Sequence, residues 1–203
     1  GSWKITKPQA EIDEMKSMNE AKNKNLRRLC KMARAWKNKH GVGIGGLLID
    51  TLAYNFMKST TNYDDKSYSS YDCLSRDFFK YLSEQPDQDH YQALGSNQDV
   101  KVKSKFQRKA KKAYENSLKA IENAGKSSAN DYWRKVYGNS FPKAKTAVVK
   151  SMTLGELRYR HTEEFIEDKF QIDIRYPLKI ECEITKHGAF IDLLRHFKRN
   201  KKK

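Results

Sequence analysis

The sequence predicts a mainly α-helical fold, a bundle-like set of helices followed by a short and incomplete segment of mixed α and β character. Two observations lead to this prediction. Apolar residues recur at helical spacing in several stretches between residues 16 and 137. Alternating apolar and polar residues, which are typical of strands, follow at residues 170–176 and 178–185. The chain is 37% hydrophobic, which is enough to form a core and argues against disorder.

We expect the first helix to run from about Lys16 to about Lys39. Arg27, Lys31 and Arg34 follow one another at i, i+4 and i+7, so they form a cationic row on one face of this helix. A second row beside it is apolar, and this amphipathic pattern indicates that the helix packs on a core. The apolar row consists of Leu26, Leu29, Cys30, Ala33 and Trp36.

A glycine-rich break separates this helix from the next. Gly41 is expected to end the first helix in the left-handed conformation. The second helix should begin at Gly46 and continue to about Met57. Because apolar residues lie on nearly every side of it, we expect this second helix to be buried.

Three further helices are expected. The third is capped by Asp65 or Ser67, carries the apolar row Tyr71, Leu74, Phe78 and Leu82, and ends before Pro86; a polar loop follows it. The fourth runs from about residue 103 to 124 and has a lysine-rich outer face. The fifth is short, with Ser128 as its cap and Gly138 at its end.

The domain organisation predicted from these elements has two parts. Residues 1–2 are typical of an expression remnant, residues 3–142 form the helical domain, and residues 143–203 begin an α+β region with a basic tail. The boundary is expected near residues 142–155. Two strands are too few to be stable alone in water, so this second region is expected to be incomplete.

Basic side chains are concentrated in two blocks of the chain, whose net charge is +16. Residues 1–60 carry 12 basic and 5 acidic side chains, and residues 101–150 carry 14 and 3. The segment between them, residues 61–100, carries 3 basic and 8 acidic side chains. This distribution suits a phosphate-rich partner, although a lysine-rich solvated surface would give the same pattern.

The cysteine and histidine residues show no metal-ligand or disulfide pattern. Cys30, Cys73 and Cys182 lie far apart, and the five histidines are scattered. No run of 18 apolar residues and no signal-peptide pattern is found. We therefore expect a cytoplasmic protein with free thiols, no metal site and no membrane partner.

Several segments, taken in order, resemble the helical half of bacterial cGAS/DncV-like nucleotidyltransferases (CD-NTases). The resemblance covers residues 8–195 approximately, and its tail is similar to the start of the C-terminal sensor region that some members carry. The family makes cyclic or linear oligonucleotide second messengers from nucleoside triphosphates in anti-phage defence. The resemblance therefore implies a nucleotide-binding helical lobe. The matching segments are NLRRLCKMARAWKNKHGVGIGGLLIDTLAYNFM, DKSYSSYDCLSRDFFKYLSEQ, FQRKAKKAYENSLKAIE and WRKVYGNSFP.

The catalytic signature of this family is missing from the chain. It consists of a Gly-Ser pair followed by paired carboxylates, which hold Mg²⁺ or Mn²⁺ in the complete enzymes. Here Gly95-Ser96 is followed only by Asp99, and Glu181 and Glu183 fit the solvated face of a strand. We expect no catalytic residue and no cofactor on this chain, a missing N-terminal catalytic half, and no activity from the chain alone.

The resemblance implies that Lys31 contacts the triphosphate of a nucleotide. Arg27 and Arg34, one turn to either side, are the other candidate phosphate ligands, and the alternative for all three is an ordinary exposed helix face. Two other functions stay open. The basic blocks could bind nucleic acid, or the C-terminal region could sense a small ligand as a regulatory fragment.

Overall fold

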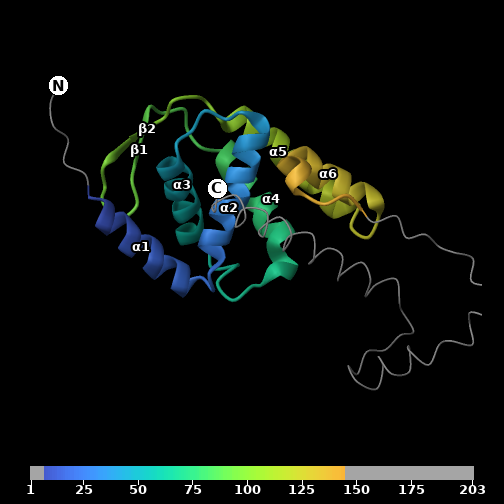
Figure 1. The fold of residues 1–203 in the computed structure, drawn as a ribbon, viewed down its shortest axis with the longest axis horizontal. Helices are drawn as coiled ribbons and strands as arrows, with labels where there is room; N and C mark the ends of the chain where they lie inside the picture. The colour runs from blue at the N-terminus through green and yellow to red at the C-terminus, as the bar shows by residue number, and fades with distance from the viewer. Residues whose placement is uncertain (1–6, 145–203) are drawn as a thin grey trace, which may run out of the picture.

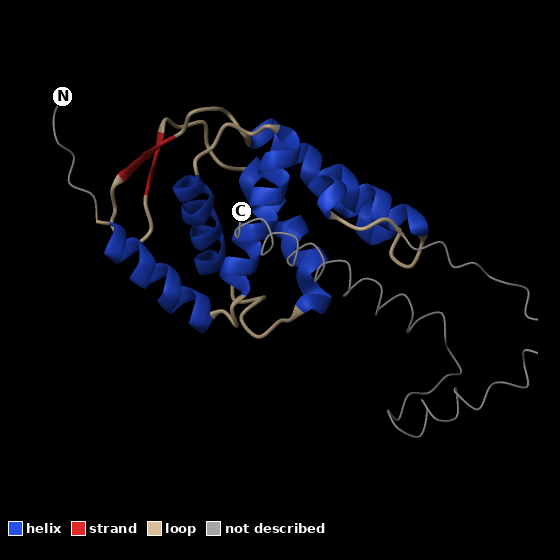
Figure 2. Ribbon diagram, in the orientation of Figure 1, coloured by secondary structure: helices blue, strands red, loops and turns tan. Residues whose placement is uncertain are grey.

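Helices α2 and α3 form the centre of the fold in the computed structural model, which describes residues 7–144 (Figure 1). Helix α1 packs against α2, while α5 and α6 run side by side at the opposite end of the molecule (Figures 1 and 2). The part described is mainly helical, which confirms the mainly α-helical character that the sequence predicts. The helices are α1 (Pro8–Ala21), α2 (Asn25–His40), α3 (Gly46–Ser59), α4 (Tyr71–Ser83), α5 (Gln107–Glu122) and α6 (Ser127–Tyr137).

The amphipathic pattern of α2 produces the packing that the sequence predicts. Its whole apolar row, from Leu26 to Trp36, is buried in the core. Gly41 ends the helix with a φ of 55°, in the left-handed region, and the amide of Val42 donates to the carbonyl of Lys37 at 3.0 Å. The glycine stop is therefore confirmed, since a residue with a side chain is strained in this conformation.

The predicted start of this helix at Lys16 is wrong, because the helical conformation is interrupted between α1 and α2. Asn23 and Lys24 have φ values of 49° and 63°, so both leave the right-handed helical region. Residues 16–21 belong to α1, a separate helix that the sequence pattern did not reveal. Helical periodicity alone continues across this point, and the break comes from tertiary contacts.

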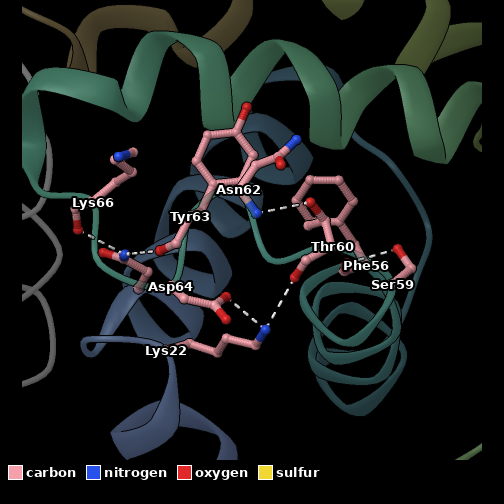
Figure 3. A network of polar contacts seen from close by, with 9 residues as sticks. Lys22, Phe56, Ser59, Thr60, Asn62, Tyr63, Asp64 and Lys66 are labelled. Carbon is pink, nitrogen blue, oxygen red and sulfur yellow. Dashed lines mark hydrogen bonds and ion pairs between the residues drawn. The ribbon is translucent and has the colours of Figure 1, made fainter.

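Figure 3 shows these contacts, which connect the turn between α1 and α2 to the loop after α3. The ammonium group of Lys22 donates to the Asp64 carboxylate at 2.6 Å and to the Thr60 carbonyl at 3.0 Å. The side-chain amide of Asn25 donates to the carbonyl of Tyr63 at 2.7 Å. Both polar groups are buried and paired, as buried polar groups must be, so they fix the turn where it is.

Helix α3 is buried along most of its length, as predicted. Leu48, Leu52, Ala53 and Met57 have no exposed surface and belong to one continuous core, in which α3 contacts α2 and α4. The helix runs two residues past the expected end at Met57. Its central position makes it the element on which the other helices pack.

The ends of the remaining helices differ from the prediction. Helix α4 begins at Tyr71 after a 3₁₀ turn, η1 (Tyr68–Ser70), and neither Asp65 nor Ser67 caps it. Ser128 lies inside α6, which starts one residue earlier, and its hydroxyl donates to Asn123 instead. Gly138 does end α6, with a φ of 73°, before a second 3₁₀ turn, η2 (Gly138–Ser140).

The predicted polar loop after α4 contains a small antiparallel hairpin of β1 (His90–Gln92) and β2 (Asp99–Lys101). In its register, Tyr91 lies opposite Val100. Three-residue strands are too short to give a recognisable alternation, which is why the sequence did not reveal them. The strands predicted at residues 170–185 lie outside the described residues. The predicted boundary near residues 142–155 lies largely outside them.

Candidate anion-binding site

A hollow of about 510 Å³ opens where α2 faces the start of α3, and it is rich in cations. Arg27, Lys31 and Arg34 all line it, so the structure brings the three predicted residues together. They stand at i, i+4 and i+7 along α2, and Lys37 continues the same row into the hollow. The rest of the lining consists of Met15, Cys30, Asn38, Gly46, Ile49 and Asp50.

Arg27 and Lys31 differ in their solvent exposure. Arg27 is exposed, and its backbone amide at the start of α2 donates to the buried side chain of Asn19 at 3.0 Å. Lys31, in the middle of the row, is half-buried. The first turn of α2 is therefore held against α1, and this contact fixes the position of the first residue of the cationic row.

Arg34 is engaged by a carboxylate from the neighbouring helix. Its Nη2 donates to both oxygens of Asp50, at 2.6 and 2.7 Å, and its Nη1 donates to the carbonyl of Cys30 at 3.2 Å. Burial lowers the pKa of Arg34, but the charge of Asp50 and this hydrogen bonding outweigh it and raise the pKa overall. Arg34 thus stays charged and joins α2 to α3.

The thiol of Cys30 lies behind this pair and belongs to the core. It is 4% exposed, and burial together with the neighbouring Asp50 charge raises its pKa well above the ordinary value. A thiol in such an environment stays protonated and unreactive. The hollow therefore offers charge and shape, not a nucleophile.

The first turn of α3, whose amides have no partner within the helix, borders the hollow at Gly46. Gly45 precedes the helix and makes no side-chain cap, and Gly46 is the first helical residue. A Cβ at Gly46 would meet only the Arg34 Nη2, at 3.9 Å, so the backbone there is accessible. A helix N-terminus attracts anions through its free amides and its dipole.

Two residues of the hollow were missed by the sequence analysis. Lys37 follows Arg34 by three residues, so the helical spacing that gave the other cations could have included it. Asp50 is the only acidic residue of the otherwise largely apolar α3. A lone carboxylate in a buried helix needs a partner, and that signal could have indicated the pair with Arg34.

The Gly95-Ser96 pair has a structural role in the described residues. Ser96 lies in the turn of the hairpin, and its hydroxyl donates to the carboxylate of Glu11 on α1 at 2.8 Å. Asp99 lies in β2 and accepts a hydrogen bond from Gln92 across the hairpin. Residues 7–144 contain no cluster of three metal-ligating side chains, so we assign no metal ligand among them.

The outer face of α5 forms a second basic surface. Arg108, Lys111, Lys112 and Lys119 are exposed on it, interrupted by Glu115 and Glu122. Lys109 belongs instead to the fold, because its ammonium group donates to the carbonyls of His40 and Gly41 at the end of α2, at 2.8 and 3.2 Å.

Comparisons with known proteins identify no relative. No family model matches the chain, and no characterised protein and no solved structure is significantly similar to it. Among residues 7–144, the helices are all too short or too polar to cross a bilayer.

Proposed function

We propose that residues 7–144 are the triphosphate-binding helical lobe of a second-messenger nucleotidyltransferase. The observation that carries the proposal is the hollow in which Arg27, Lys31, Arg34 and Lys37 converge from one face of α2. A volume of about 510 Å³ falls within the range of roughly 300–1,000 Å³ that is usual for small-molecule sites.

The chemistry of the hollow suits a phosphate chain. Lysine and arginine make charge-assisted hydrogen bonds to phosphate oxygens, and these bonds are stronger than neutral ones. The open N-terminus of α3 supplies further donors beside Arg34. In this proposal the lobe binds and orients a nucleoside triphosphate, while a separate catalytic half with its Mg²⁺ or Mn²⁺ performs the transfer.

Replacing Lys31 by Ala tests this function. Binding of inorganic triphosphate, measured by isothermal titration calorimetry, should be weak in the parent chain and should weaken further as salt is added. Because an ion pair open to water contributes about 0–1 kcal/mol, Lys31→Ala should reduce the affinity by up to about fivefold. In an enzyme complete with its catalytic half, the same change should reduce product formation more strongly, since it removes charge held against the reacting phosphate.

The matched control is Lys112→Ala, which removes an exposed lysine from α5. It should leave triphosphate binding nearly unchanged. Equal losses in both variants would mean that the protein attracts anions only through its net charge, and the proposal would be wrong. A loss confined to Lys112→Ala, with duplex DNA or RNA as the ligand, would favour the alternative of a nucleic-acid surface on α5.

A further inference from the structure

Asp50 places a negative charge in the hollow beside the four cations that line it. Its carboxylate is only partly exposed, with 24% of the side chain accessible, and it holds Arg34 through both oxygens. The other terminal nitrogen of Arg34 is held by the Cys30 carbonyl. A phosphate that approached Arg34 would therefore have to displace a carboxylate already in place, and it would meet like-charge repulsion.

The same carboxylate keeps capacity for a hydrogen-bond donor. An ionised carboxylate has about four lone-pair sites; Arg34 uses one on each oxygen and the Cys30 thiol uses a third, which leaves one for a ligand. A bare polyphosphate brings only acceptors and charge to the hollow. A nucleoside brings hydroxyl and amino groups, which can donate to Asp50 while its phosphates meet Lys31 and Lys37.

We propose, on the basis of the proposed function, that Asp50 determines specificity by distinguishing a nucleoside triphosphate from a bare polyphosphate. It does so by holding Arg34 away from phosphate and by accepting a hydrogen bond from the sugar or base. Asp50 is then a ligand for the nucleoside, and Arg34 is a positioning residue that keeps the carboxylate oriented.

The test compares the affinities for ATP and inorganic triphosphate in Asp50→Asn and the parent chain, without metal and at constant ionic strength. Asn keeps the shape of Asp and can still accept from Arg34 through its side-chain oxygen, so the fold should survive. We expect inorganic triphosphate to bind about fivefold more tightly to the variant, since like-charge repulsion is removed and Arg34 is held by one neutral oxygen in place of two charged ones. ATP should gain clearly less, so that the preference for ATP over inorganic triphosphate falls.

Two controls connect the change to the hollow. Glu122→Gln on α5 removes one negative charge from an exposed site, and it should leave the preference as it is in the parent chain. Combining Asp50→Asn with Arg34→Gln should abolish the gain for inorganic triphosphate, because the guanidinium that would bind the phosphate is gone. If Asp50→Asn unfolds, Asp50→Ser serves in its place, with thermal melting as the check on folding.

The outcomes separate this inference from the proposed function. Equal gains for ATP and inorganic triphosphate, or no change for either, overturn the role of Asp50 alone while Lys31→Ala still weakens binding. Binding that is insensitive to Lys31→Ala overturns the proposed function and, with it, the role of Asp50. A fall in preference that also appears in Glu122→Gln would show that only net charge matters, and it too overturns the inference.

Discussion

Gly95 allows the hairpin to approach α1 more closely than any residue with a side chain could. It has a φ of 71°, and a Cβ built there would overlap the backbone carbonyl of Ala10 and crowd Glu14. Gly41, with a φ of 55°, has the same conformational requirement but open space around it. A comparison of substitutions at these two glycines therefore separates the cost of backbone strain from the cost of steric overlap.

We expect Gly95→Ala to destabilise the protein more than Gly41→Ala. A left-handed backbone costs a residue with a side chain about 1–2 kcal/mol, which is the loss expected at Gly41. At Gly95 the same strain applies, and α1 must also move away from the hairpin. Urea denaturation of both variants measures the difference, and equal losses would show that α1 adapts without cost.

At this scale the sequence predicted the positions of side chains on one helix but not their partners on another. Arg27, Lys31 and Arg34 share a face because the helical period is fixed. The pairing of Arg34 with Asp50 depends on how α2 meets α3, which no periodicity encodes.

The C-terminal end of α2 illustrates how neighbouring elements complete a helix. Lys109 of α5 donates to the last carbonyls of α2, and the Nε2 of His40 lies 3.1 Å from the carbonyl of Val136 on α6. Burial chiefly lowers the pKa of His40, and the charges of Lys39 and Lys109 add to this effect, while the carbonyls of Val136 and Lys135 oppose it.

The lowered pKa of His40 predicts a loss of stability in mild acid. The folded state prefers the neutral ring, so this contribution is fully present above the unfolded pKa of about 6.5 and is lost as the pH falls through the lower folded value. His40→Gln should flatten the pH dependence of the unfolding free energy below that point. His90→Gln, at an exposed position on β1, is the control and should leave it unchanged.

The elements themselves were predictable to different degrees, for physical reasons. Helices α4, α5 and α6 follow apolar spacing because each packs one face on the core, and α3 is recognisable because it is apolar on nearly every side. The break at Asn23 and Lys24 was not predictable, since bonds from Lys22 and Asn25 to a loop some forty residues away stabilise it. The hairpin was missed because it has three residues a strand.

On the scale of the whole molecule, a single apolar core extends through residues 7–144. It contains buried side chains from α2, α3, α4, α5 and α6, together with the hairpin residue Tyr91. Helix α1 joins it through the half-buried Met15 and Met18. Because α3 lies at its centre, the helices of this part should unfold together.

Leu52 of α3 has no exposed surface, and its replacement by Ala tests this cooperativity. Such a truncation in a core costs about 2–5 kcal/mol of unfolding free energy. In native-state hydrogen exchange, the free energy of opening of the most protected amides should therefore fall by the same amount in α2, α3 and α6. Leu47→Ala removes the same atoms from a half-buried position five residues earlier, and it should cost clearly less. If α6 keeps its protection in Leu52→Ala while α3 loses it, the core consists of two units. The cationic hollow between α2 and α3 would then belong to a smaller unit that unfolds without α6.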